Sequence, residues 1–202
     1  MITYEYDAKT LASVERKLGL FKDEAPKALK NAVNDTAKMA RKELASEAQK
    51  TYAIKTGGFN RYMKIRSATK SRPEAVIRAT GAPIEIKKFS VNGGKGAKLL
   101  SVMINRKKGR KEFKNDAFVN NIAKKGQTRQ RDTKKGAKGT SVKHVAVAMR
   151  ETEKRLHIKS LFTVSIPQMI GSEKYVYGVV EPHIESNLQE NIEKQVRKIL
   201  EA

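Results

Sequence analysis

The feature that most constrains this fold is a long run of helical spacing near the start of the chain. The run reads KDEAPKALKNAVNDTAKMARKELASEAQK, and its apolar residues recur at intervals of three and four. Asp23 is a candidate N-cap, and Pro26 falls in the first turn, where a missing N–H costs little. The pattern predicts a helix within about Glu24–Lys50, roughly 40 Å long. Its stripe is rich in alanine, so a sheet or another helix can approach it closely.

The spacing changes from helical to alternating after this run and becomes helical again at the C-terminus. Met63 and Ile65 share one face of a predicted strand, and Ala75, Ile77 and Ala79 share one face of the next. Residues 83–91 and 98–105 are predicted to form a further strand pair. The final segment, IESNLQENIEKQVRKILEA, is typical of an amphipathic helix. We therefore expect an α+β fold in which a long N-terminal helix and a C-terminal helix pack on an antiparallel sheet.

The expected boundaries follow from these patterns. The sheet should extend from Tyr62 to Arg150, interrupted by a long basic loop, and the last helix should lie within Ile184–Leu200. A chain of 202 residues can hold one good-sized core or two small ones. We expect a single domain over residues 1–202.

The charge of the chain is strongly positive and is unevenly distributed. The chain has 43 Lys and Arg against 21 Asp and Glu, a net charge of +22. Residues 1–60 have 11 basic and 8 acidic side chains, residues 61–143 have 24 and 5, and residues 144–202 have 8 and 8. A strongly basic middle thus lies between two nearly neutral ends. This excess implies an anionic partner, such as nucleic acid, an acidic protein surface or an anionic membrane.

Several function classes find no support in the sequence. The chain has no cysteine, so neither a disulfide nor a thiolate nucleophile can form, and no apolar run is long enough to span a membrane. The N-terminus lacks the pattern of a signal peptide, and we expect a soluble protein made in a reducing compartment. His144, His157 and His183 lack metal-ligand spacing, and NGGKGA lacks the spacing of a phosphate-binding loop. Glu85, Glu151 and Glu153 have no evident catalytic partner. We expect no enzyme activity, no cofactor and no metal.

The strongest candidate for a binding site is the strip KKGQTRQRDTKKGAKGT at residues 124–140, together with a basic turn at residues 106–111. Dispersed cations on a glycine-punctuated backbone can neutralise phosphates without reading base sequence. The strip has no aromatic residue, which argues against stacking on single-stranded bases. The alternatives are contact with an acidic neighbour or a loop that is merely solvated. The candidate contact residues are Lys124, Lys125, Arg129, Arg131, Lys134, Lys135, Lys138, Arg106, Lys107, Lys108, Arg110 and Lys111.

Four stretches, in order, resemble the prophage minor tail protein Z family of long-tailed phages. They are ALKNAVNDTAKMARKELASEA, APIEIKKFSV, AFVNNI and HVAVAMRETEKRLHIKSLFTVSIPQMI. The resemblance covers about residues 25–200, and none of its motifs is catalytic. The chain departs from the family at residues 123–143, where family members have a short loop and this chain has a long basic one.

The resemblance implies a structural protein of the virion, located at the head-proximal end of the tail. Such a protein completes the tail and joins it to the head around the DNA channel. Its implied partners are further copies of itself in a hexameric ring, other tail and connector proteins, and double-stranded DNA. No membrane is implied, and the protein would be made in the host cytoplasm.

Two other function classes remain open from the residues alone. A free-standing basic protein that binds DNA or RNA without sequence preference would be a stable monomer that binds by itself. A basic toxin or nuclease would need a His–acid or Arg–His cluster, and the sequence shows none.

Overall fold

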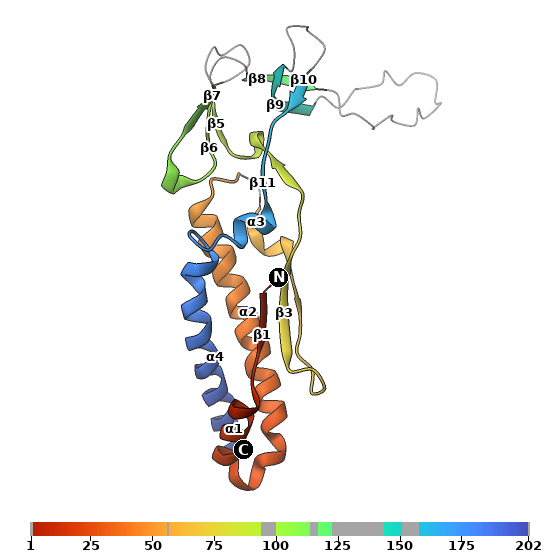
Figure 1. Ribbon diagram of the computed structural model, residues 1–202, viewed down its shortest axis with the longest axis vertical. Helices are drawn as coiled ribbons and strands as arrows, with labels where there is room; N and C mark the ends of the chain where they lie inside the picture. Colours follow the sequence, from red (N-terminus) through yellow and green to blue (C-terminus); the bar gives the residue numbers. More distant parts are fainter. Residues whose placement is uncertain are drawn as a thin grey trace, which may run out of the picture. The chain divides into compact units, whose positions relative to one another are not determined.

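The computed structural model describes residues 2–55, 57–93, 100–113, 117–122, 144–150 and 158–201. The expected α+β class is confirmed, with long helices near both ends of the chain and antiparallel strands between them (Figure 1). The chain divides into two compact units. The first contains residues 1–52, 57–82 and 164–202, and the second contains residues 53–56 and 83–163. The expectation of a single domain stays a prediction.

The first unit is built on helices. They are α1 (Ala8–Leu18), the 3-10 helix η1 (Gly19–Glu24), α2 (Ala25–Thr51), the 3-10 helix η2 (Phe59–Tyr62), α3 (Ile166–Ile170) and α4 (Tyr177–Leu200). The Asp7 carboxylate caps α1 by accepting a hydrogen bond of 2.8 Å from the Thr10 backbone N–H. Gly19 ends α1 with a φ of 55°, a backbone conformation that favours glycine.

The long helix α2 confirms the predicted boundaries to within one residue. The predicted N-cap is wrong, because Glu24 precedes the helix and makes no side-chain cap, whereas Asp23 lies within η1. The 3-10 turn leads directly into α2, so the residue before the helix already has helical backbone angles and cannot cap it. Pro26 occupies the first turn, as expected.

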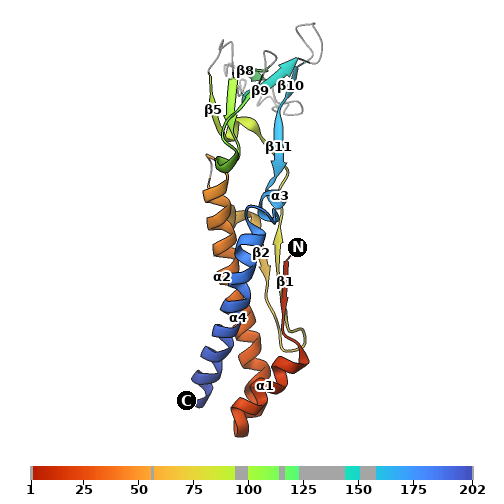
Figure 2. The same ribbon diagram turned by 60° about the vertical axis from the view of Figure 1, so that its left-hand side comes forward.

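Helices α2 and α4 run side by side in opposite directions (Figures 1 and 2). The alanines of the α2 stripe are buried, including Ala32, Ala37 and Ala48, so the two backbones can approach closely. Among the polar contacts that cross the pair, one is buried: the amide of Asn191 donates a hydrogen bond of 2.9 Å to the Thr36 hydroxyl. This bond satisfies two polar groups that would be costly to bury alone.

A three-stranded antiparallel sheet completes the first unit. Its strands are β1 (Ile2–Glu5), β2 (Met63–Arg66) and β3 (Glu74–Ala79), in the order β1-β3-β2. The inward face includes Met63, Ala75 and Ile77, and the sheet packs on α2. Asn34 of α2 fixes the β2–β3 loop, because its amide accepts a hydrogen bond from the Ala68 N–H and donates one to the Ala68 carbonyl.

The second unit is built on short strands. They are β4 (Pro83–Glu85), β5 (Ser90–Asn92), β6 (Leu100–Met103), β7 (Lys111–Phe113), β8 (Ala117–Ile122), β9 (His144–Arg150) and β10 (Ile158–Ser160), with β11 (Phe162–Ser165) beginning in it. Two sheets have the orders β5-β6-β7 and β10-β9-β8, and β4 pairs with β11. The predicted pairing of residues 83–91 with residues 98–105 is confirmed for β5 and β6.

Three features differ from the sequence expectations. Strand β1 was not expected, and the strands form several small sheets in place of one. Helix α4 begins at Tyr177, before the predicted boundary, and contains Pro182. The predicted loop over residues 124–140 lies outside the described residues.

Candidate functional site

The described residues contain no cluster of histidine and carboxylate side chains that could hold a metal ion. His144 begins β9, and His183 lies in α4 with its Nδ1 atom 3.9 Å from the Glu43 carboxylate, too far for a hydrogen bond. Glu85 ends β4, and His157, Glu151 and Glu153 lie outside the described residues. No helix in the described part of the chain is long and apolar enough to cross a membrane.

Tyr4 and Tyr177, two partly buried tyrosines of the first unit, have raised pKa values. Burial raises the pKa of the Tyr4 phenol, and the nearby Tyr177, Glu181 and Glu43 raise it further. Burial also raises the pKa of Tyr177, whose hydroxyl donates a hydrogen bond of 2.9 Å to Glu181. These shifts hold both phenols in the neutral form, which is poorly suited to act as a base or nucleophile.

The predicted basic turn at residues 106–111 is present in the second unit. Arg106, Lys107 and Lys108 form the 3-10 helix η4, which the buried Asn105 caps by accepting a hydrogen bond of 2.8 Å from the Lys107 N–H. Gly109 follows with a φ of 73°, so the chain reverses into β7 at a residue that tolerates this angle. All three basic side chains of η4 are exposed.

Arg110 and Lys111 have different surroundings. The guanidinium of Arg110 donates hydrogen bonds of 3.2 Å and 3.1 Å to the carbonyl and hydroxyl of Ser90, which ties the start of β7 to β5. Lys111 lies opposite Val102 in the β6–β7 pair, and its side chain is exposed. Arg110 therefore has a structural contact, whereas Lys111 is presented to solvent.

Hydrogen bonds between distant segments bring further lysines to this region. The Ala53 N–H donates to the Ile104 carbonyl at 2.9 Å, and the Lys55 N–H donates to the Lys88 carbonyl at 2.8 Å. The buried side chains of Ile54 and Phe89 lie next to each other at an isolated bridge. We name the result the η3–η4 basic surface, after η4 and the 3-10 helix η3 (Ile86–Lys88). Its members are Lys55, Lys87, Lys88, Arg106, Lys107, Lys108, Arg110 and Lys111.

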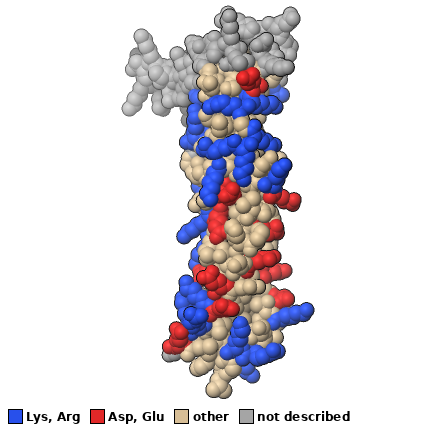
Figure 3. All heavy atoms as spheres, turned by 90° about the vertical axis from the view of Figure 1, so that its left-hand side faces the viewer, with Lys and Arg blue, Asp and Glu red and all other residues tan. Residues whose placement is uncertain are grey.

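The charge is divided between the two units as unevenly as along the sequence. The second unit has 23 basic and 6 acidic side chains, net +17, and the first has 20 and 15, net +5. Figure 3, viewed from the side of α4, shows Asp and Glu side chains together with Lys and Arg over the first unit. The described part of the second unit shows mainly Lys and Arg in the same view. A surface of this kind favours phosphates or carboxylates.

The structure thus brings together five of the predicted contact residues, Arg106, Lys107, Lys108, Arg110 and Lys111. The other seven lie outside the described residues: Lys124, Lys125, Arg129, Arg131, Lys134, Lys135 and Lys138. The sequence patterns did not indicate Lys55, Lys87 and Lys88, which join the surface through backbone pairing over long sequence distances. The adjacent basic residues Lys87 and Lys88 could have indicated part of this surface. We predicted a strand over residues 83–91, whereas these two lysines lie in a 3-10 turn.

Comparison with known proteins gives no match: no family, no curated protein and no solved structure is detectably similar to this chain.

Proposed function

We propose that this chain is a structural virion protein of a long-tailed phage, located at the head-proximal end of the tail. In that position it completes the tail and joins it to the head as a homo-oligomeric ring, expected to be hexameric. Other tail and connector proteins contact the ring, and double-stranded DNA passes through it. The proposal rests on the sequence resemblance over about residues 25–200 and on the distribution of charge.

The observation that carries the proposal is the division of the chain into a unit with a net charge of +5 and a unit with a net charge of +17. Duplex DNA carries one negative charge per about 1.7 Å of its axis, so cations dispersed over a surface can neutralise it without base contacts. The η3–η4 basic surface presents such cations, and the 124–140 strip supplies more in the same unit. No aromatic residue lies in η3, η4 or the strip that could stack on bases.

The test uses the full chain with Lys55, Lys87, Lys107 and Lys108 changed to Gln in one variant, and Arg129, Arg131, Lys134, Lys135 and Lys138 changed to Gln in another. Each variant should keep its helical circular dichroism, because no changed residue belongs to an apolar stripe. Duplex binding should weaken, and the dependence of log affinity on log salt should flatten by about 0.9 for each phosphate that the variant no longer neutralises.

A matched control changes four lysines of the first unit, Lys9, Lys17, Lys22 and Lys30, to Gln and should leave duplex binding nearly unchanged. Equal weakening in the control and the variants would contradict a role for these surfaces. A chain that binds duplex as a stable monomer and is absent from virions would favour a free-standing nucleic-acid-binding protein.

A further inference from the structure

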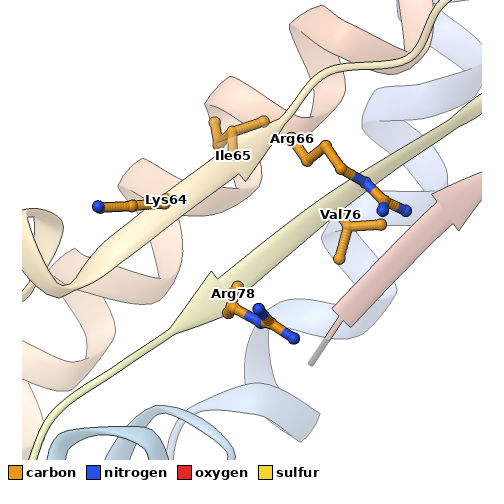
Figure 4. Close-up of a pocket in the computed structure, with 5 residues that line it drawn as sticks. All are labelled: Lys64, Ile65, Arg66, Val76 and Arg78. Carbon is orange, nitrogen blue, oxygen red and sulfur yellow. The ribbon is translucent and has the colours of Figure 1, made fainter.

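The outer face of the β2–β3 ribbon contains a basic hollow of about 200 Å³. Lys64, Arg66 and Arg78 line it together with Ile65 and Val76, and no acidic residue is among its lining residues. Figure 4 shows Val76 lying between Arg66 and Arg78 on this ribbon. An apolar floor with cations around it would fit an acidic side chain whose methylene groups also pack.

The charges of this hollow are poorly compensated within the described part of the chain. Arg66 bonds to Glu74, which also lies 3.5 Å from Arg72, so one carboxylate serves two guanidinium groups. Lys64 and Arg78 have no such carboxylate partner among the described residues, and they lie directly opposite each other across β2 and β3. Like charges in directly opposed positions destabilise a strand pair, and a bound anion would remove that penalty.

An acidic groove of about 460 Å³ lies at the other edge of the same sheet. Glu5 at the end of β1, Asp7 at the N-cap of α1 and Glu185 of α4 are among its lining residues, and the lining contains no basic residue. Tyr6, Leu188 and Ile192 provide its apolar lining. Since β1 and β2 are the two edges of the β1-β3-β2 sheet, the groove and the hollow are at different places on one unit.

The wider charge of the first unit follows the same division. Residues 57–82, which include β2 and β3, have six basic and one acidic side chain. The rest of the unit has 14 of each, so this segment accounts for its whole net charge of +5. Residues 177–193 of α4 have four glutamates and no lysine or arginine. The first unit of every copy therefore carries two surfaces of opposite sign, one on β2 and β3 and the other between the end of β1 and α4.

We propose that the basic hollow of one copy binds the acidic groove of a second copy, in a head-to-tail contact. Two different surfaces meet in such a contact, so every growing assembly keeps one unoccupied hollow and one unoccupied groove at its ends. Repetition of the contact closes into a ring or continues as a filament. The inference deepens the proposed function and rests on it for the ring, because it names the surfaces by which neighbouring copies touch. Matching of Lys64 and Arg78 with Glu5 and Glu185 fixes the orientation of the contact.

Duplex DNA is a weaker candidate for the same hollow. Glu74 and Glu5 lie directly opposite each other on β3 and β1, on the outer face that carries Lys64 and Arg78. Phosphates that follow this face would meet those carboxylates, whereas acidic side chains that reach only Lys64 and Arg78 would not. The complementary groove, in addition, is present in every copy of the chain.

The experiment measures self-association of the purified full chain by sedimentation at low and high salt. One variant carries Lys64→Glu and Arg78→Glu, and another carries Glu5→Lys and Glu185→Lys. Each should weaken self-association on the order of a hundredfold, since like charges then face each other in the contact. An equimolar mixture of the two variants should associate again, because each reversed surface then finds its complement on the other variant.

Matched controls make the same changes of net charge elsewhere on the first unit, with Lys9→Glu and Lys22→Glu in one variant and Asp23→Lys and Glu201→Lys in the other. Both controls should associate like the wild type, and circular dichroism checks that every variant is folded.

A monomeric wild type, an unchanged association in the variants, or no recovery on mixing would overturn the interface. Weaker duplex binding with unchanged self-association would assign the hollow to DNA. The location of the chain in particles tests the proposed function separately, so either proposal can fail without the other.

Discussion

Tyr4 shows at the scale of one residue how the first unit tolerates an unsatisfied polar group. Its hydroxyl oxygen is buried and has no hydrogen-bond partner among the described residues, although Tyr177, Glu181 and Glu43 are close enough to raise its pKa. A buried hydroxyl without a partner costs about 1–3 kcal/mol. The ring itself packs against the cluster of Val33, Ala37, Ala68 and Ala75. The apolar contacts of the Tyr4 ring, and not a hydrogen bond of its hydroxyl, therefore hold the side chain in place.

The first prediction concerns the substitution Tyr4→Phe. At neutral pH the free energy of unfolding should be unchanged or higher by about 1 kcal/mol, because the unsatisfied hydroxyl is removed while the ring contacts remain. The wild type should lose stability as the pH rises above about 10, since the unfolded chain then releases the Tyr4 proton and the folded chain, with its raised pKa, retains it. The Tyr4→Phe variant should lose less stability over the same rise in pH, because it has no phenol at this position.

Urea unfolding at neutral and alkaline pH measures both effects. Some alkaline loss of stability should persist in the variant, because burial also raises the pKa values of Tyr6, Tyr52 and Tyr177. Identical alkaline losses of stability in the wild type and the variant would show that Tyr4 does not contribute.

At the scale of the elements, the stability of the first unit depends on where α1, α2 and α4 meet. Leu29 is fully buried there among Val14, Leu18, Ala25 and Val196. Leu29→Ala should lower the free energy of unfolding by about 2–5 kcal/mol, the usual cost of a cavity of this size in a core. Leu20→Ala is the matched control, since Leu20 is 97% exposed in η1 and its truncation should change stability by less than about 0.5 kcal/mol.

Urea titration followed by helical circular dichroism compares the two variants. A cost below about 1 kcal/mol for Leu29→Ala would mean that this cluster does not hold the three helices together.

The elements differ in how well the sequence predicts them. Helix α2 was predicted to within one residue because its 27 residues repeat the helical spacing many times. Strand β1 has only four residues, too few for alternation to be recognised, and it pairs with β3 across about seventy residues of sequence. The start of α4 was missed because Pro182 is a typical helix breaker, yet here it lies inside the helix.

The sequence shows which segments are rich in Lys and Arg, but only partly which of these residues lie together on a surface. The basic residues at 106–111 are close in sequence, so the turn that presents them could be predicted from Gly109 and the residues beside it. Lys55 and Lys88 meet only through pairing of distant backbone segments. The outward positions of Lys64 and Arg78 follow from the alternation of β2 and β3, but their direct opposition requires the register of the pair.

At the scale of the whole molecule, the two compact units differ in the contacts for which they are suited. The first unit has long helices, a sheet whose edge strands are β1 and β2, and a net charge of only +5, which suits contacts between copies. The second has most of the positive charge, which suits an anionic partner. Self-association and DNA binding should therefore respond to different sets of substitutions.

The most direct test of the central claim is electron microscopy of phage particles that contain this chain, with the chain located by its density or by a small tag. We expect a ring of several copies at the head-proximal end of the tail, around the path of the DNA. A chain absent from the particle, present as a single copy, or found only away from the head–tail junction would contradict it.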